Sequence, residues 1–201
     1  MREQLQLVLA VENAKIDLAA RTTLNLALLF QHADKDCKDY CNESDIVGLC
    51  EELGMVVSAS ETHALFANRS NGDLLPRLRF GDFTALFIAE FNPEYKNSQM
   101  NRFIQYRDLP LILSGDEKFH LRRVLHAHFA VYAALRRQSP LLSQADVRDA
   151  FRFMDTDYDG FIGAQDMKRL MSGSGCVLAD RDLQILLKVA ESGRQAYAQS
   201  S

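Results

Sequence analysis

The sequence predicts an all-α protein, and three observations support this fold class. Apolar residues recur at the three-to-four-residue spacing of helices along most of the chain. Four prolines, ten glycines and no tryptophan among 201 residues favour helices over a β-fold rich in turns. Polar pairs also mark helix starts, such as Ser114 with Glu117, where each side chain can bind a backbone N–H group of the other residue. We therefore expect several amphipathic helices.

The first half of the chain contains five expected helices. Each has apolar residues at helical spacing, and together they cover residues 3–19, 22–32, 45–53, 60–67 and 82–91. Gly54 ends the third helix, because glycine readily adopts the left-handed conformation that terminates helices.

The second half begins with an expected linker over residues 92–113, where Asn92-Pro93, Asn97 and Pro110 interrupt the helical pattern. A long helix follows over residues 115–137. Three further helices are expected: one ends at Met154, and the others cover residues 166–171 and 180–189.

Composition excludes several classes of protein. The net charge of −4 comes without an excess of basic residues over the chain, so we expect no binding to nucleic acid. The longest apolar stretches are far shorter than the roughly 18 residues of a membrane-spanning helix. Charged residues within the apolar pattern of the N-terminus argue against a signal peptide. Four cysteines are too few for a disulfide scaffold, which predicts reduced thiols and a cytoplasmic protein.

Residues 155–166, DTDYDGFIGAQD, form a candidate metal-binding loop. Its acidic residues alternate along the chain, so a tight loop would direct their oxygens toward one point, as a hard divalent cation requires. Gly160 stands where such a loop must turn sharply. The expected ligands are four carboxylates and one backbone carbonyl, from Asp155, Asp157, Asp159, Phe161 and Asp166.

This loop and the apolar helices around it resemble an EF-hand of the calmodulin and troponin C kind. The resemblance implies one Ca²⁺ site. It also implies that apolar Ile162 joins a short β-bridge to a second loop. The family usually ends its loop with glutamate, whereas this chain has the shorter Asp166. We therefore expect weakened Ca²⁺ affinity and relatively better Mg²⁺ binding.

Residues 34–45 repeat the pattern without gaps, with Asp34 aligned to Asp155 and Asp45 to Asp166. Lys38 takes the place of a ligand, and Asp39 takes the place of the glycine, so we expect this loop to bind no cation. Its thiols, Cys37 and Cys41, are expected to be buried structural groups, although a redox-sensitive loop is a second interpretation.

The resemblance also predicts partner hands. One is a degenerate loop over residues 70–82 that keeps apolar Leu78 and acidic Asp82, and the other is an incomplete hand over residues 191–201. Either helix 115–137 or a partner's helix is expected to cover the incomplete hand. The expected organisation is an N-terminal lobe (1–91), a linker with an extra helix (92–139) and a C-terminal lobe (140–201).

The function implied by the resemblance is that of a non-enzymatic, calcium- or magnesium-binding regulatory protein. In such proteins the cation opens a helix pair, which then binds a helical segment of a partner protein. The alternative is a constitutive subunit, similar to a light chain, in a cytoskeletal or flagellar assembly. In that case the cation has only a structural role.

Overall fold

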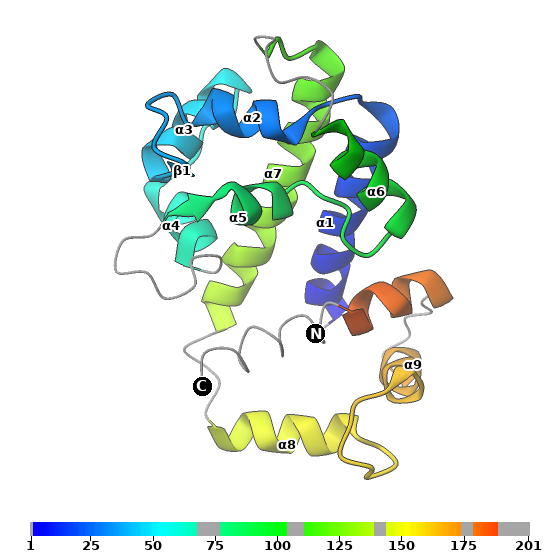
Figure 1. Cartoon of the computed structure of the whole chain (residues 1–201). Coiled ribbons are helices and arrows are strands. Elements are labelled where there is room, and N and C mark those ends of the chain that lie inside the picture. Colours follow the sequence, from blue (N-terminus) through cyan, green and yellow to red (C-terminus); the bar gives the residue numbers. More distant parts are fainter. Residues whose placement is uncertain (1, 68–76, 104–110, 139–143, 174–178, 189–201) are drawn as a thin grey trace. The chain divides into compact units, whose positions relative to one another are not determined.

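The computed structural model describes residues 2–67, 77–103, 111–138, 144–173 and 179–188. Helices dominate these residues, which confirms the all-α prediction (Figure 1). The strands of the described part are the two-residue β1 (Tyr40–Cys41) and β2 (Leu78–Arg79). They pair antiparallel, with Cys41 opposite Leu78. Across the described residues, no helix has the length and apolar character needed to cross a membrane.

The chain forms two compact units. The first unit is Ala10–Arg136, and the second combines Met1–Leu9 with Arg137–Ser201. Residues 92–136, expected to lie between two lobes, therefore group with the preceding residues. The helices lying wholly or mostly in the first unit are α1 (Arg2–Arg21), α2 (Leu26–Ala33), α3 (Glu43–Glu52), α4 (Ala59–Ala67), α5 (Phe80–Ala85), α6 (Pro93–Arg102) and α7 (Gly115–Gln138).

The helices of the first unit begin at local capping signals. Asn25 caps α2 by accepting hydrogen bonds from the N–H groups of Ala27 and Leu28, so this helix starts later than expected. Asn42 and Asp45 form a reciprocal capping box at the start of α3. Ser114 and Glu117 form the predicted box at the start of α7.

The core of the first unit is aromatic and aliphatic. Its largest fully buried side chains come from α1 to α5, α7 and their connections: Leu18, Leu26, Leu29, Ile46, Leu65, Phe66, Leu78, Phe83, Leu86, Phe87, Leu121 and Leu125. Two polar contacts also hold α7 in place. His128 Nε2 lies 2.9 Å from the carbonyl oxygen of Leu86, and Arg123 pairs with Asp17 of α1 at 2.7 Å.

Several apolar side chains of α7 are thus buried in the core of their own unit: Leu121, Val124, Leu125, Phe129 and Tyr132. The expectation that helix 115–137 or a partner's helix covers the incomplete fourth hand stays a prediction. Residues 191–201, which were expected to form that hand, lie outside the described residues, as do residues 70–76 of the expected second loop.

The linker expected over residues 92–113 is wrong for residues 93–102, because α6 occupies them, and residues 104–110 lie outside the described residues. Asn92 caps this helix, and Pro93 suits its first turn, where no backbone N–H group is needed. Buried Gln99 accepts a hydrogen bond from the N–H of Ala89 and donates one to the carbonyl of Phe87. Arg102 donates to the carbonyl of Thr22, at 2.7 Å. These contacts attach α6 to the rest of the first unit.

The second unit contains α8 (Gln144–Met154), α9 (Ala164–Gly173) and a further helical segment over residues 180–188. Helices α8 and α9 flank the predicted metal-binding loop, as expected. An ion pair of 2.8 Å between Lys168 and Asp180 joins α9 to the last segment.

Candidate metal centre

The loop between α8 and α9 turns through two residues with left-handed backbone. Tyr158 has φ 59° and Gly160 has φ 84°. Glycine adopts this region at no steric cost, which explains the residue type at position 160. The turn directs the acidic side chains before it toward the same volume.

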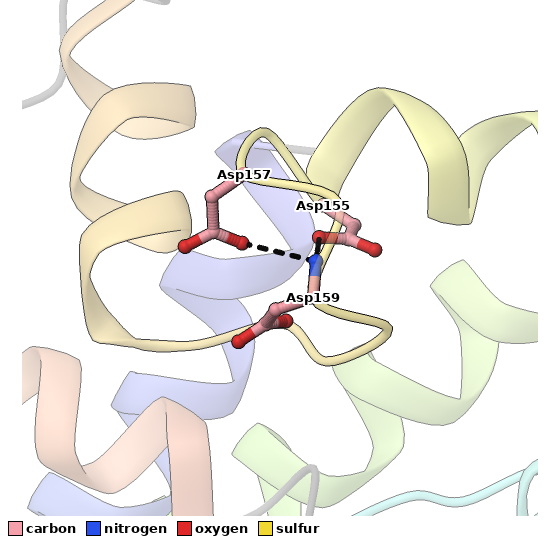
Figure 2. Close-up of side chains that lie close together, drawn as sticks. All are labelled: Asp155, Asp157 and Asp159. Atoms are coloured by element: carbon pink, nitrogen blue, oxygen red, sulfur yellow. Dashed lines mark hydrogen bonds between the residues drawn. The ribbon is translucent and has the colours of Figure 1, made fainter.

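Asp155, Asp157 and Asp159 form the carboxylate cluster of the site (Figure 2). One oxygen of each carboxylate lies within 4.8 Å of those of the other two. The N–H of Asp159 donates to Asp155 Oδ1 (3.1 Å) and Asp157 Oδ1 (3.4 Å), and the N–H of Gly160 donates to Asp155 Oδ2 (3.0 Å). Asp155 is buried, whereas the other two carboxylates face solvent. Three hard oxygen donors fixed by the backbone suit a divalent cation of the Ca²⁺ or Mg²⁺ type.

Asp166 lies outside this cluster and is held by Thr156. Its Oδ1 accepts hydrogen bonds from the hydroxyl and the N–H of Thr156, and its Oδ2 accepts one from the N–H of Gly163 at 2.9 Å. The Thr156 hydroxyl, followed by the two N–H groups, lowers the pKa of Asp166. These hydrogen bonds therefore favour the ionised form of the carboxylate.

Thr156 is a site residue that sequence reasoning missed, because the second position of such a loop supplies no ligand in the family pattern. Its hydroxyl contacts Asp166 and also accepts a 2.8 Å hydrogen bond from Arg169 of α9. Thr156 and Arg169 line a mostly apolar hollow of about 400 Å³ together with Phe153, Leu170 and Gly173. The carboxylate of Asp166, the twelfth residue of the loop, is thus linked through Thr156 to an apolar surface.

Phe161 was predicted to supply a backbone carbonyl. Its N–H donates to Asp159 Oδ1 at 2.7 Å, which orients that carboxylate, and its side chain is 60% exposed. The ligand role of its carbonyl stays a prediction.

The loop over residues 34–45 has the same backbone pattern as the loop over residues 155–166. Cys37 and Asp39 adopt left-handed φ values of 51° and 63°, at the positions of Tyr158 and Gly160. Asp39 can take the place of Gly160 because aspartate tolerates this conformation better than most residues. The expectation that this loop binds no cation stays a prediction. Asp34 accepts hydrogen bonds from the N–H groups of Lys38 and Asp39. In the same way, Asp155 accepts hydrogen bonds from the N–H groups of Asp159 and Gly160. Likewise, the Asn42 N–H donates to Asp45 at 2.8 Å.

The two thiols of this loop lie in different environments. Cys41 is fully buried, as expected, and burial raises the pKa of its thiol to about 12. Cys37 is exposed, so its expected burial is wrong. It occupies the left-handed turn, where the side chain is directed away from the core.

Comparison of the chain with family models, with curated proteins and with solved structures found no match.

Proposed function

We propose that this chain is a non-enzymatic, EF-hand-type protein that binds one divalent cation in residues 155–166. The bound cation regulates the binding of this chain to a partner protein. The convergence of Asp155, Asp157 and Asp159 carries the proposal. The repeated backbone pattern in residues 34–45 supports the family resemblance. The pairing of Cys41 with Leu78 gives further support. Each stands four residues before the acidic end of its loop, where the family pattern has an apolar residue that pairs with the partner loop.

The residues of the loop fit a hard cation. Asp155, Asp157 and Asp159 would supply carboxylate oxygens, the Phe161 carbonyl a neutral one, and Asp166 the closing carboxylate. The cation would neutralise the mutual repulsion of the clustered carboxylates. Because Asp166 is shorter than the usual glutamate, we propose that Mg²⁺ competes with Ca²⁺ for this site.

Asp166 connects the cation to the protein surface. To reach the carboxylate cluster, it must weaken its hydrogen bonds to Thr156, and Thr156 also binds Arg169. Thr156 and Arg169 both line the apolar hollow, so a shift of Asp166 would reshape the wall of this hollow. Phe153, in the same wall, is 72% exposed. An apolar partner helix is the expected ligand of such a surface.

The alternative is a constitutive subunit of the light-chain kind in a cytoskeletal or flagellar assembly. One observation favours it: residues 34–45 keep the loop conformation although Lys38 stands at a ligand position. A loop that carries its own positive charge at a ligand position would need no metal ion to keep its shape. A cytoplasmic location remains part of both proposals.

Calorimetric titration with Ca²⁺ at fixed Mg²⁺, together with a dye that fluoresces on apolar surfaces, tests the proposal. We expect one ion per chain and increased dye fluorescence. Asp155→Ala should abolish binding, because it removes a direct ligand. Asp149→Asn is the matched control, since it removes an exposed charge of α8 outside the loop.

Each of the other outcomes has a clear meaning. Binding without added fluorescence would favour the structural subunit. Stoichiometry of two ions per chain, or undiminished binding by Asp155→Ala, would contradict a single site at residues 155–166. Submicromolar Ca²⁺ binding that is unaffected by millimolar Mg²⁺ would contradict the proposed competition.

A further inference from the structure

The Lys38 ammonium group lies among three carboxylates of the first loop. Its Nζ is 3.1 Å from Asp36 Oδ2, 3.2 Å from Asp45 Oδ2 and 3.6 Å from Asp34 Oδ1. These carboxylates occupy loop positions 1, 3 and 12. In residues 155–166 the same positions belong to Asp155, Asp157 and Asp166.

Two of the three carboxylates are well shielded from water. The exposed fractions of the side chains are 4% for Asp34 and 12% for Asp45, against 77% for Asp36. A shielded carboxylate is costly unless a charge or hydrogen-bond donors compensate it. Lys38, whose side chain is only 20% exposed, supplies a compensating charge to both of them.

We propose that Lys38 is a built-in cation: its ammonium group fills the position of a divalent ion and keeps the first loop in its conformation without metal. This inference goes beyond the proposed function, which concerns residues 155–166. It makes the first loop a latent metal site, in which a side chain of the same loop excludes the ion. The first hand is then independent of the Ca²⁺ concentration.

The position of Lys38 explains why this matters to the fold. Asp34 is the C-terminal cap residue of α2, and Asp45 lies in the first turn of α3. The ammonium group therefore connects the two helices across the loop. Between them, Cys41 pairs with Leu78 in the β1–β2 ladder. The contacts of Lys38 with Asp34 and Asp45 thus fix the geometry of the α2–α3 hand and of β1.

The protonation state of Lys38 agrees with this role. Burial alone would lower the pKa of its ammonium group. Hydrogen bonds to Asp36 and Asp45, together with the negative charges of these carboxylates, outweigh burial and raise that pKa. The group therefore stays charged at neutral pH.

The decisive test measures Ca²⁺ stoichiometry by equilibrium dialysis in full-length chains carrying Asp155→Ala, which disables the other loop. We expect no bound ion with Asp155→Ala alone and one ion per chain when Lys38→Asp is added. Lys35→Asp is the matched control: it makes the same charge change in the same loop, but Lys35 is exposed and outside the carboxylate group. Absence of binding by the Lys38→Asp chain, with helical content intact, would overturn the proposal.

A second pair of variants covers the case in which Lys38→Asp does not fold. Lys38→Met leaves the shielded carboxylates uncompensated, so without divalent ions its melting temperature should fall by about 5 °C or more. Millimolar Ca²⁺ should restore much of that loss. Lys35→Met should melt like the parent chain. Equal melting temperatures for Lys38→Met and Lys35→Met would show that Lys38 does not hold the loop.

Discussion

Burial separates the described cysteines into one accessible thiol and two protected ones. Cys37 is exposed, whereas Cys41 and Cys50 are buried, and burial raises the pKa of both protected thiols to about 12. Because the thiolate is the reactive form, low thiolate content and poor access act in the same direction. Of the three, Cys37 alone is therefore accessible to reagents in the folded protein.

This difference predicts the order of alkylation in the native protein. Iodoacetamide at pH 8 should modify Cys37 at least about tenfold faster than Cys41 or Cys50, as followed by peptide mass spectrometry. Unfolding in urea should make the three rates similar, which provides the control. Rapid native labelling of Cys41 would show that the β1–β2 region opens readily.

The clustering of carboxylates in residues 155–166 was predictable from sequence, whereas two key side-chain contacts were not. The alternation of Asp155, Asp157 and Asp159 is local, so spacing alone predicts their convergence. The contacts of Lys38 depend on how a long flexible side chain folds back over its own loop. The Thr156–Asp166 hydrogen bond joins residues at opposite ends of the loop. Neither contact leaves a periodic signal.

At the scale of elements, helix starts depend on capping residues that are close together in the sequence. They can therefore be predicted from the sequence when the capping pattern is recognised. Ser114 and Glu117 predicted the start of α7. Asn92 and Pro93 carried an equally local signal for α6, but they suggested a linker because proline also breaks helices. The contacts of Gln99 and Arg102 with distant backbone groups then attach α6 to the first unit. These long-range contacts could not be predicted from local sequence.

The cap of α4 gives a pH-dependent prediction. Glu61 accepts hydrogen bonds from the hydroxyl (2.6 Å) and the N–H (2.8 Å) of Ser58, and these bonds lower the pKa of Glu61 below its ordinary value of 4.5. The ionised cap thus stabilises the protein above pH 4.5. This contribution is lost as the pH falls through the lowered pKa of the folded state.

Glu61→Gln should therefore lower the free energy of unfolding at pH 7 by about 0.5–1 kcal/mol. The difference from the parent chain should shrink below pH 4.5, because protonated Glu61 loses its advantage over glutamine. Urea denaturation from pH 3 to pH 7 measures it. Glu51→Gln, at an exposed site on α3, controls for the loss of one charge. A difference that is constant over this pH range would contradict the ionised cap.

At the scale of the whole molecule, the two related loops belong to different compact units. Residues 34–45 lie in the first unit, whose aromatic core includes α7, and residues 155–166 lie in the second. One loop contains its own positive charge, and the other presents clustered carboxylates without a lysine among its residues. Two loops with similar backbone patterns therefore differ in charge: one is already neutralised by a lysine, and the other has uncompensated carboxylates. We therefore expect an added cation to act on the second unit alone.

Hydrogen exchange followed by mass spectrometry can test this division in the intact chain. At Ca²⁺ concentrations about 100 times the dissociation constant, binding should stabilise the occupied region by about 2.7 kcal/mol, since only the folded site binds the ion. Peptides spanning α8, the loop and α9 should then exchange up to roughly 100-fold more slowly. Peptides covering residues 34–45 should not change, because Lys38 already compensates their carboxylates. Asp155→Ala should remove the protection. Equal protection of both loops in the parent chain would mean that the first loop binds the ion or that the units are coupled.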